Sequence, residues 1–178
     1  IDTADVFVTN LRTGALTRLG LDHETLLARN DQLVYCGITG YGNEGADADR
    51  PAYDIAAFWA RSGLASLLTP EGANPPFQRG GMGDHNAGVS GAAAISAALY
   101  SREKTGKGQF VSTSLYRQGA YTIGFDIGTT LVIWSLGQML LTESSKEFSR
   151  STYFENFIKA LSNSPAVKGL LGAILIQS

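Results

Sequence analysis

The sequence lacks the usual marks of a secreted, membrane-bound or nucleic-acid-binding protein. It has a single cysteine, so no disulfide can form within the chain. Its longest apolar stretch, residues 169–176, is far shorter than the roughly 20 residues that span a bilayer. The 14 basic residues do not outnumber the 16 acidic ones, which disfavours a basic surface for nucleic acid. The first residues show no signal-peptide pattern, so we expect a cytoplasmic protein that binds neither membrane nor nucleic acid.

The composition is that of a folded domain rich in glycine. The chain has 178 residues, of which 44% are hydrophobic and 17% charged, and this balance excludes a disordered chain. Glycine accounts for 21 of the 178 residues, about 12% against an average near 7%. The glycines are spread along the chain, which predicts many tight turns and close backbone approaches. Such features suit α/β proteins that bind flat or phosphorylated ligands.

The hydrophobic pattern predicts an α/β fold with a parallel, Rossmann-like sheet and flanking helices. Two β-branched runs, residues 4–10 and 32–39, enclose two short helical segments, and this order is typical of a βαβ unit. A third strand is expected at residues 109–114. Longer helices are expected at residues 55–68, 87–104 and from 115 towards 125. The composition changes beyond about residue 131, where a charged, serine-rich stretch and amphipathic helical patterns follow. We therefore predict one domain over 1–130 and a divergent helical tail over 131–178.

Three familiar motifs receive structural interpretations. Residues 40–45 match the glycine pattern of a dinucleotide-binding turn, but acidic residues and Pro51 follow in place of a helix, so a plain loop is favoured. Cys36 lies in an apolar strand and is interpreted as core filler. His23 and His85 are too few and too far apart to indicate a metal site, and His23 is placed at a solvated helix start.

Asp84 is the acidic residue with two plausible roles. It ends a loop rich in glycine and proline and precedes a long helix, where an aspartate most often serves as an N-cap. The same position favours a nucleophile, because the positive end of a helix stabilises a carboxylate. Glycines at positions 80, 81 and 83 would let a substrate approach it.

Several separated motifs resemble one family when they are taken in order. Ala4–Gly20 is similar to a stretch of the family III CoA-transferases, the CaiB/BaiF group that includes formyl-CoA transferase-like proteins. The resemblance covers about residues 4–130. It continues through Asn30–Cys36, Gly40–Gly42, Asp49–Asp54, Gly83–Asp84 and Arg102–Gln109.

The resemblance implies an enzyme that moves CoA between an acyl-CoA and a free carboxylic acid. Asp84 would attack the thioester to give a mixed anhydride, and no metal or organic cofactor would be needed, since coenzyme A is a substrate. The residues expected by analogy to contact CoA are Asn10, Leu11, Arg12, Arg18, Pro51, Ala52, Tyr53 and Asp54. The arginines suit phosphate groups, and surface ion pairs are their alternative role.

Departures from the family pattern define the alternatives. Leu11 stands where the family usually has phenylalanine, and Thr13 where it has proline. Related acyl-CoA racemases carry histidine at the position of Tyr53, so its absence favours transfer over racemisation. The alternatives are an acyl-CoA racemase or isomerase, and a catalytically silent CoA-binding remnant.

The family's members are about twice as long as this chain, which is therefore interpreted as an N-terminal-half fragment of the interlocked family fold. A full-length protein would form an interlocked homodimer. The acyl donor and the acceptor acid are not specified by these residues.

Overall fold

The computed structural model describes residues 1–142 and residue 159. The chain divides into two compact units. The first comprises residues 1–64 and 77–120, and the second comprises residues 65–76 together with the chain from 121 onward. The predicted site residues all belong to the first unit, which also contains the sheet.

The first unit follows a strand–helix–strand order. Its elements are β1 (Val6–Thr9), α1 (Thr13–Leu19), α2 (His23–Arg29), β2 (Val34–Thr39), the π-helix η1 (Ile55–Arg61), α4 (Met82–Thr105) and β3 (Phe110–Ser114). The short helix α3 (Leu64–Leu67) begins at the last residue before the first break. The long helix α5 (Leu115–Thr142) begins in the first unit and continues in the second.

The three strands form one parallel sheet in the order β1-β2-β3. Both pairings are parallel, with Val8 beside Cys36 and Cys36 beside Val111. Parallel neighbours require crossover connections, and helices supply both of them here. The predicted α/β class and parallel sheet are confirmed.

One face of the sheet is covered by an aromatic cluster under α2. Phe7, Tyr35 and Phe110 are register partners across the three strands, with ring centroids 5.1 Å and 5.6 Å apart. Leu26 of α2 packs into the same cluster. His23 begins α2 as expected, but it is half-buried because its ring stacks on Phe110 with the centroids 4.3 Å apart. Local sequence patterning does not reveal this burial, because the ring that covers His23 belongs to the distant strand β3.

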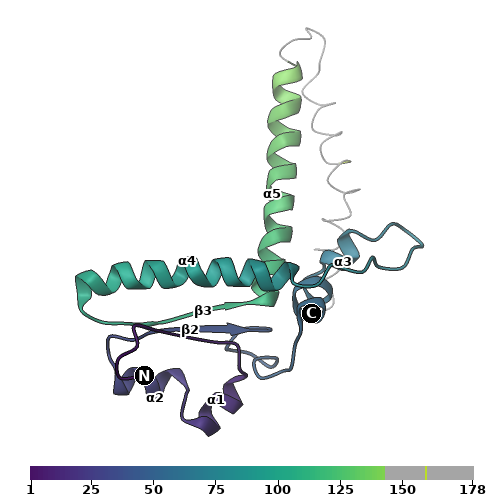
Figure 1. Ribbon diagram of the computed structural model, residues 1–178. Coiled ribbons are helices and arrows are strands. Elements are labelled where there is room, and N and C mark those ends of the chain that lie inside the picture. The colour runs from purple at the N-terminus through teal and green to yellow at the C-terminus, as the bar shows by residue number, and fades with distance from the viewer. Residues whose placement is uncertain (143–158, 160–178) are drawn as a thin grey trace. The chain divides into compact units, whose positions relative to one another are not determined.

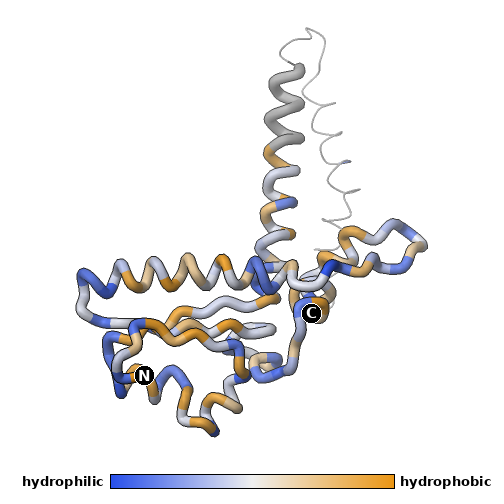
Figure 2. The backbone as a smooth tube through the Cα atoms, in the orientation of Figure 1, coloured by the Kyte–Doolittle hydropathy of each residue, from blue (hydrophilic) through white to orange (hydrophobic). Residues whose placement is uncertain are grey.

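The opposite face of the sheet packs against α4 (Figure 1). A Cβ added at Gly91 would lie 3.6 Å from the Cys36 sulfur and 3.7 Å from Cδ1 of Ile38, so the helix backbone sits directly on the strand side chains. Cys36 is fully buried, and burial raises the pKa of its thiol. Figure 2 shows the hydrophobic character of the strands between these layers. The interpretation of Cys36 as core filler is confirmed.

Three helix boundaries differ from the sequence-based expectation. α4 begins at Met82, five positions before Ala87, because Gly81 turns the chain with a φ of 85° and acts as its N-cap. Asp84 is therefore the third residue of the helix and not its N-cap. The helical run 55–68 is divided by Gly63, whose φ is 96°. α5 passes through residue 130 without a break, and the predicted tail beyond residue 142 lies almost entirely outside the described residues.

Arg102 fastens the last turns of α4 to the start of the sheet. Its guanidinium donates to the backbone oxygen of Gln32 at 3.0 Å and to Oδ1 of Asp5 at 2.9 Å. The Arg102 side chain is 17% exposed, whereas that of Asp5 is 77% exposed. The carbonyl contact is therefore expected to contribute more than the ion pair, because water screens an exposed carboxylate.

We expect Arg102→Ala to lower the free energy of unfolding by about 1.5–3 kcal/mol, the usual range for a hydrogen bond to a charged group. Asp5→Ala removes only the exposed partner and should cost about 0.5 kcal/mol or less. Urea denaturation of both variants measures the difference. Equal losses in the two variants would contradict the assignment of the larger share to the Gln32 carbonyl.

No helix among the described residues is long and apolar enough to cross a lipid bilayer.

Candidate active site

Asp84 lies in the first turn of α4 with its side chain exposed. The unpaired N–H groups of a helix's first turn give that end a partial positive charge, which stabilises a nearby carboxylate. Within the described part of the chain, the Asp84 carboxylate makes no hydrogen bond or ion pair. Its oxygens are therefore available to an incoming ligand.

Gly83 is buried, although the next residue is exposed. Its N–H donates to Oδ1 of Asp54 at 2.9 Å. A Cβ at this position would overlap Oδ1 of Asp54 and the Cβ and Cγ atoms of Phe58. Glycine is thus required for α4 to approach η1 this closely.

The predicted CoA-binding residues Asn10, Leu11, Arg12 and Arg18 are all exposed. Arg12 is the N-cap residue of α1, and Arg18 lies in its last turn. Neither arginine forms an ion pair with any described residue, so the alternative role in surface salt bridges is not seen. Exposed guanidinium groups without an acidic partner are suited to bind phosphate oxygens.

The segment Asp49–Asp54 connects these residues to the start of α4. At one end, Oδ1 of Asp49 accepts a hydrogen bond from Gly14 N at 3.0 Å, in the first turn of α1. At the other end, Asp54 accepts the hydrogen bond from Gly83 N. One short segment therefore contacts both α1, near the residues predicted to bind CoA, and the start of α4, which carries the predicted nucleophile.

The residues within this segment differ strongly in exposure. Tyr53 is 84% exposed, whereas Asp54 is 8% exposed. Pro51 is exposed, and Ala52 is half-buried against Gly40, which has no side chain to obstruct it. Of the four residues expected to contact CoA here, Asp54 is the buried one, and its carboxylate is turned into the protein.

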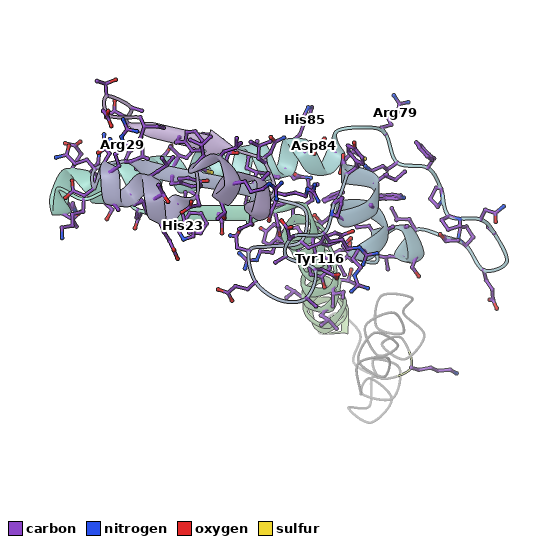
Figure 3. The ribbon with its side chains drawn as sticks, turned by 90° about the horizontal axis from the view of Figure 1, so that it is seen from below. His23, Arg29, Arg79, Asp84, His85 and Tyr116 are labelled. Carbon is purple, nitrogen blue, oxygen red and sulfur yellow. The ribbon has the colours of Figure 1, made fainter. Side chains whose placement is uncertain are left out.

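His85 follows Asp84 and is also exposed. Figure 3 shows both residues at the start of α4, with the His85 side chain directed away from the ribbon. Neighbouring residues on a helix do not face each other, so this geometry does not place His85 and Asp84 on opposite sides of one substrate. Among the described residues, no group of three or more His, Cys, Asp and Glu side chains is arranged to hold a metal ion.

Two contacts at this site were not predicted from the sequence. They are the bonds from Asp49 to Gly14 and from Asp54 to Gly83, which join residues 35 and 29 positions apart. In both bonds the donor is a backbone N–H group, which nearly every residue type carries, so the residue type does not identify the donor. The sequence signal for these two bonds is weak: an aspartate stands at each end of the segment Asp49–Asp54, and each of the two partner residues is a glycine.

The sequence profile of CoA-transferase family III matches residues 1–153. The chain belongs to CoA-transferase family III. The match extends past the domain boundary predicted near residue 130, which stays a prediction.

Named relatives of this family III chain are CoA-transferases. It is 44% identical over 124 residues to cinnamoyl-CoA:phenyllactate CoA-transferase of Clostridium sporogenes, covering 70% of this chain and 30% of that protein. It is 36% identical over 129 residues to (R)-2-hydroxy-4-methylpentanoate CoA-transferase of Clostridioides difficile, covering 72% and 32%. The matched region thus spans about a third of the length of these relatives.

Solved structures agree with the family assignment. A CaiB/BaiF family protein from Brucella suis superposes with a TM-score of 0.65 at 33% identity, covering 72% of this family III chain and 34% of that protein. Rv3272 from Mycobacterium tuberculosis gives a TM-score of 0.65 at 29% identity, covering 73% and 36%. The α/β fold of this chain is therefore the fold of the family.

Proposed function

We propose that this family III chain serves in moving CoA between an acyl-CoA and a free carboxylic acid, with Asp84 as the nucleophile that accepts the acyl group. The observation that carries the proposal is an exposed carboxylate without a partner among the described residues, held in the first turn of α4 beside the buried Gly83. The relatives' names, each a CoA-transferase, support the same reaction class.

The proposed reaction begins when a carboxylate oxygen of Asp84 attacks the thioester carbonyl. The C–S bond breaks, CoA leaves as a thiolate, and a mixed anhydride remains on the enzyme. The thiolate then attacks the Asp84 carbonyl, which releases the donor acid as a carboxylate and leaves an aspartyl thioester. An acceptor carboxylate displaces CoA to form a second anhydride, and the thiolate attacks the acceptor acyl group to regenerate Asp84. Aspartate has about the basicity of the substrate acids, so each exchange is nearly balanced.

In this proposal the exposed residues around α1 bind coenzyme A. Arg12 and Arg18 would contact its phosphates, since both guanidinium groups are exposed and have no acidic partner in the described residues. Asn10, Leu11 and the exposed part of Asp49–Asp54 would contact the remainder. The steps above require no metal or organic cofactor, because CoA is both substrate and leaving group.

The full-length protein is proposed to act as an interlocked homodimer. Several large apolar side chains are exposed in the described part of this chain, including Phe77 at 87% and Val89 at 72%. A second subunit that covered these side chains would remove them from water, which is favourable.

Trapping the covalent intermediate tests the proposed nucleophile. The chain is mixed with a panel of acyl-CoAs, treated with hydroxylamine and mapped by peptide mass spectrometry. We expect a hydroxamate on the peptide containing Asp84. A longer relative treated in parallel shows whether the reaction requires segments beyond this chain. Absence of an adduct from both proteins would overturn the transferase proposal in favour of proton-transfer chemistry or a silent CoA-binding remnant.

A further inference from the structure

The segment Asp49–Asp54 ends in two aspartates that make the same kind of contact. Each carboxylate accepts a hydrogen bond from the second residue of a helix, Gly14 of α1 or Gly83 of α4. The contacts differ in burial, because the bond to Gly14 is exposed and the bond to Gly83 is buried. The buried contact is adjacent in sequence to the proposed nucleophile.

We propose that Asp54 is a positioning residue, which holds the first turn of α4 and thereby Asp84 from inside the protein, and that Asp54 does not bind CoA. The role assigned to Asp84 rests on the proposed function. The anchoring of α4 by Asp54 is a separate property that can be measured without any reaction.

The burial of Asp54 is the first support. The residue is 8% exposed, although it adjoins Tyr53, which is 84% exposed. It occupies the N-cap position of η1, yet its side chain makes no capping bond to that helix and reaches across to Gly83. A carboxylate used in this way is not available to a ligand in solvent.

The tight packing around Gly83 is the second support. Gly83 lies against Phe58 as well as Asp54, so its backbone has contacts on the η1 side that leave no space for a side chain. Because Gly83 and Asp84 share a peptide bond, a displacement of Gly83 is passed directly to the nucleophile. Catalytic groups displaced by about 1 Å lose about a hundredfold in rate.

The second carboxylate oxygen of Asp54 is the third support. Oδ2 is buried and has no hydrogen-bond partner within the described residues. A buried oxygen without a partner is costly, so its burial calls for a specific explanation. Proximity to the positive end of α4 offsets part of this cost, because helix N-termini stabilise negative groups.

Amide hydrogen exchange measured by NMR tests the anchor directly. In Asp54→Ala we expect the Gly83 amide to exchange at least about tenfold faster, since one hydrogen bond to a charged group is lost. Asp54→Asn keeps an acceptor oxygen and should stay within about threefold of the parent chain. Asp49→Ala is the matched control, which should speed exchange at Gly14 and leave Gly83 unchanged. Unchanged protection of Gly83 in Asp54→Ala overturns the proposal.

Folding of the variants is checked at the β2 amides, whose exchange should not change. If Asp54→Ala loses protection throughout the sheet, Asp54→Leu replaces it, because leucine restores side-chain bulk without an acceptor. Loss of Gly83 protection confined to the start of α4 in that variant supports the anchor. Retention of protection there overturns it.

CoA binding and single-turnover acylation separate this inference from the proposed function. We expect Asp54→Asn to bind CoA within about twofold of the parent chain and to restore the acylation rate that Asp54→Ala loses by about tenfold or more. Weaker CoA binding by Asp54→Asn, or acylation unaffected in Asp54→Ala, would overturn the positioning role. A parent chain that exchanges as expected but never acylates at Asp84 refutes the proposed function and leaves the anchor supported.

Discussion

An Asp84→Asn variant is expected to form no acyl adduct while binding CoA as the parent chain does. The amide has nearly the shape of the carboxylate but lacks the anionic oxygen that attacks the thioester. Since Asp84 is exposed and its side chain contacts no partner among the described residues, the substitution should leave folding intact. Removing a covalent nucleophile costs several powers of ten, so we expect the acylation rate to fall at least about 10³-fold.

Two further variants define the requirement at this position. Asp84→Glu keeps the carboxylate but moves it by one methylene, and a misplacement of that size is expected to slow acylation about a hundredfold. His85→Gln changes the exposed neighbour and should acylate normally, because the proposed reaction assigns no proton transfer to it. Mass spectrometry of the hydroxamate measures all three. An adduct that persists in Asp84→Asn would place the nucleophile elsewhere, and loss of reaction in His85→Gln would favour proton-transfer chemistry.

Gly83→Ala is expected to be the most damaging single substitution in α4. The added methyl group would overlap Oδ1 of Asp54 and the side chain of Phe58, both of which are buried. Overpacking of this kind usually costs about 1–3 kcal/mol, and loss of the bond to Asp54 adds about 1 kcal/mol or more. We therefore expect the free energy of unfolding to fall by about 3 kcal/mol.

Gly88→Ala is the matched control within the same helix. No atom lies within 4 Å of a Cβ added there, so alanine gains helix propensity without a collision. This variant should be more stable than the parent by about 0.5–1 kcal/mol. Urea denaturation of both proteins provides the comparison. A Gly83→Ala protein as stable as Gly88→Ala would show that α4 does not pack against η1 at this point.

The sheet was predictable because its signals are local. Apolar runs separated by short helical segments indicated parallel strands, and Cys36 lay in a run without polar residues. The beginning of α4 was not predictable for the opposite reason. Residues 80–88 contain four glycines, which disfavour helix in isolation, and the close contact of Gly83 with η1 overrides that preference.

The site was only partly predictable. Asp84 was singled out by its place between a glycine-rich loop and a long helix, and the arginines near α1 by a family resemblance. The exposure of all three agrees with the roles proposed for them. Asp54 was assigned to CoA by analogy with the family, as part of the segment Pro51–Asp54, and that analogy does not reveal which of the four side chains is buried. Its partner is a backbone N–H 29 positions away, and no periodicity or residue type encodes such a bond.

The hydrogen bonds at both ends of Asp49–Asp54 also bear on how the family can tolerate changes in chain length. A piece of six residues spans at most about 20 Å, and each residue inserted or deleted alters that reach by about 3.3 Å. The loop before it, residues 40–48, is held by other contacts: the Gly40 oxygen accepts a hydrogen bond from Tyr116 N, and Asp47 pairs with Arg61 of η1. The interval from Asp49 to Asp54 should therefore keep its length, because it is the spacer between α1 and the start of α4.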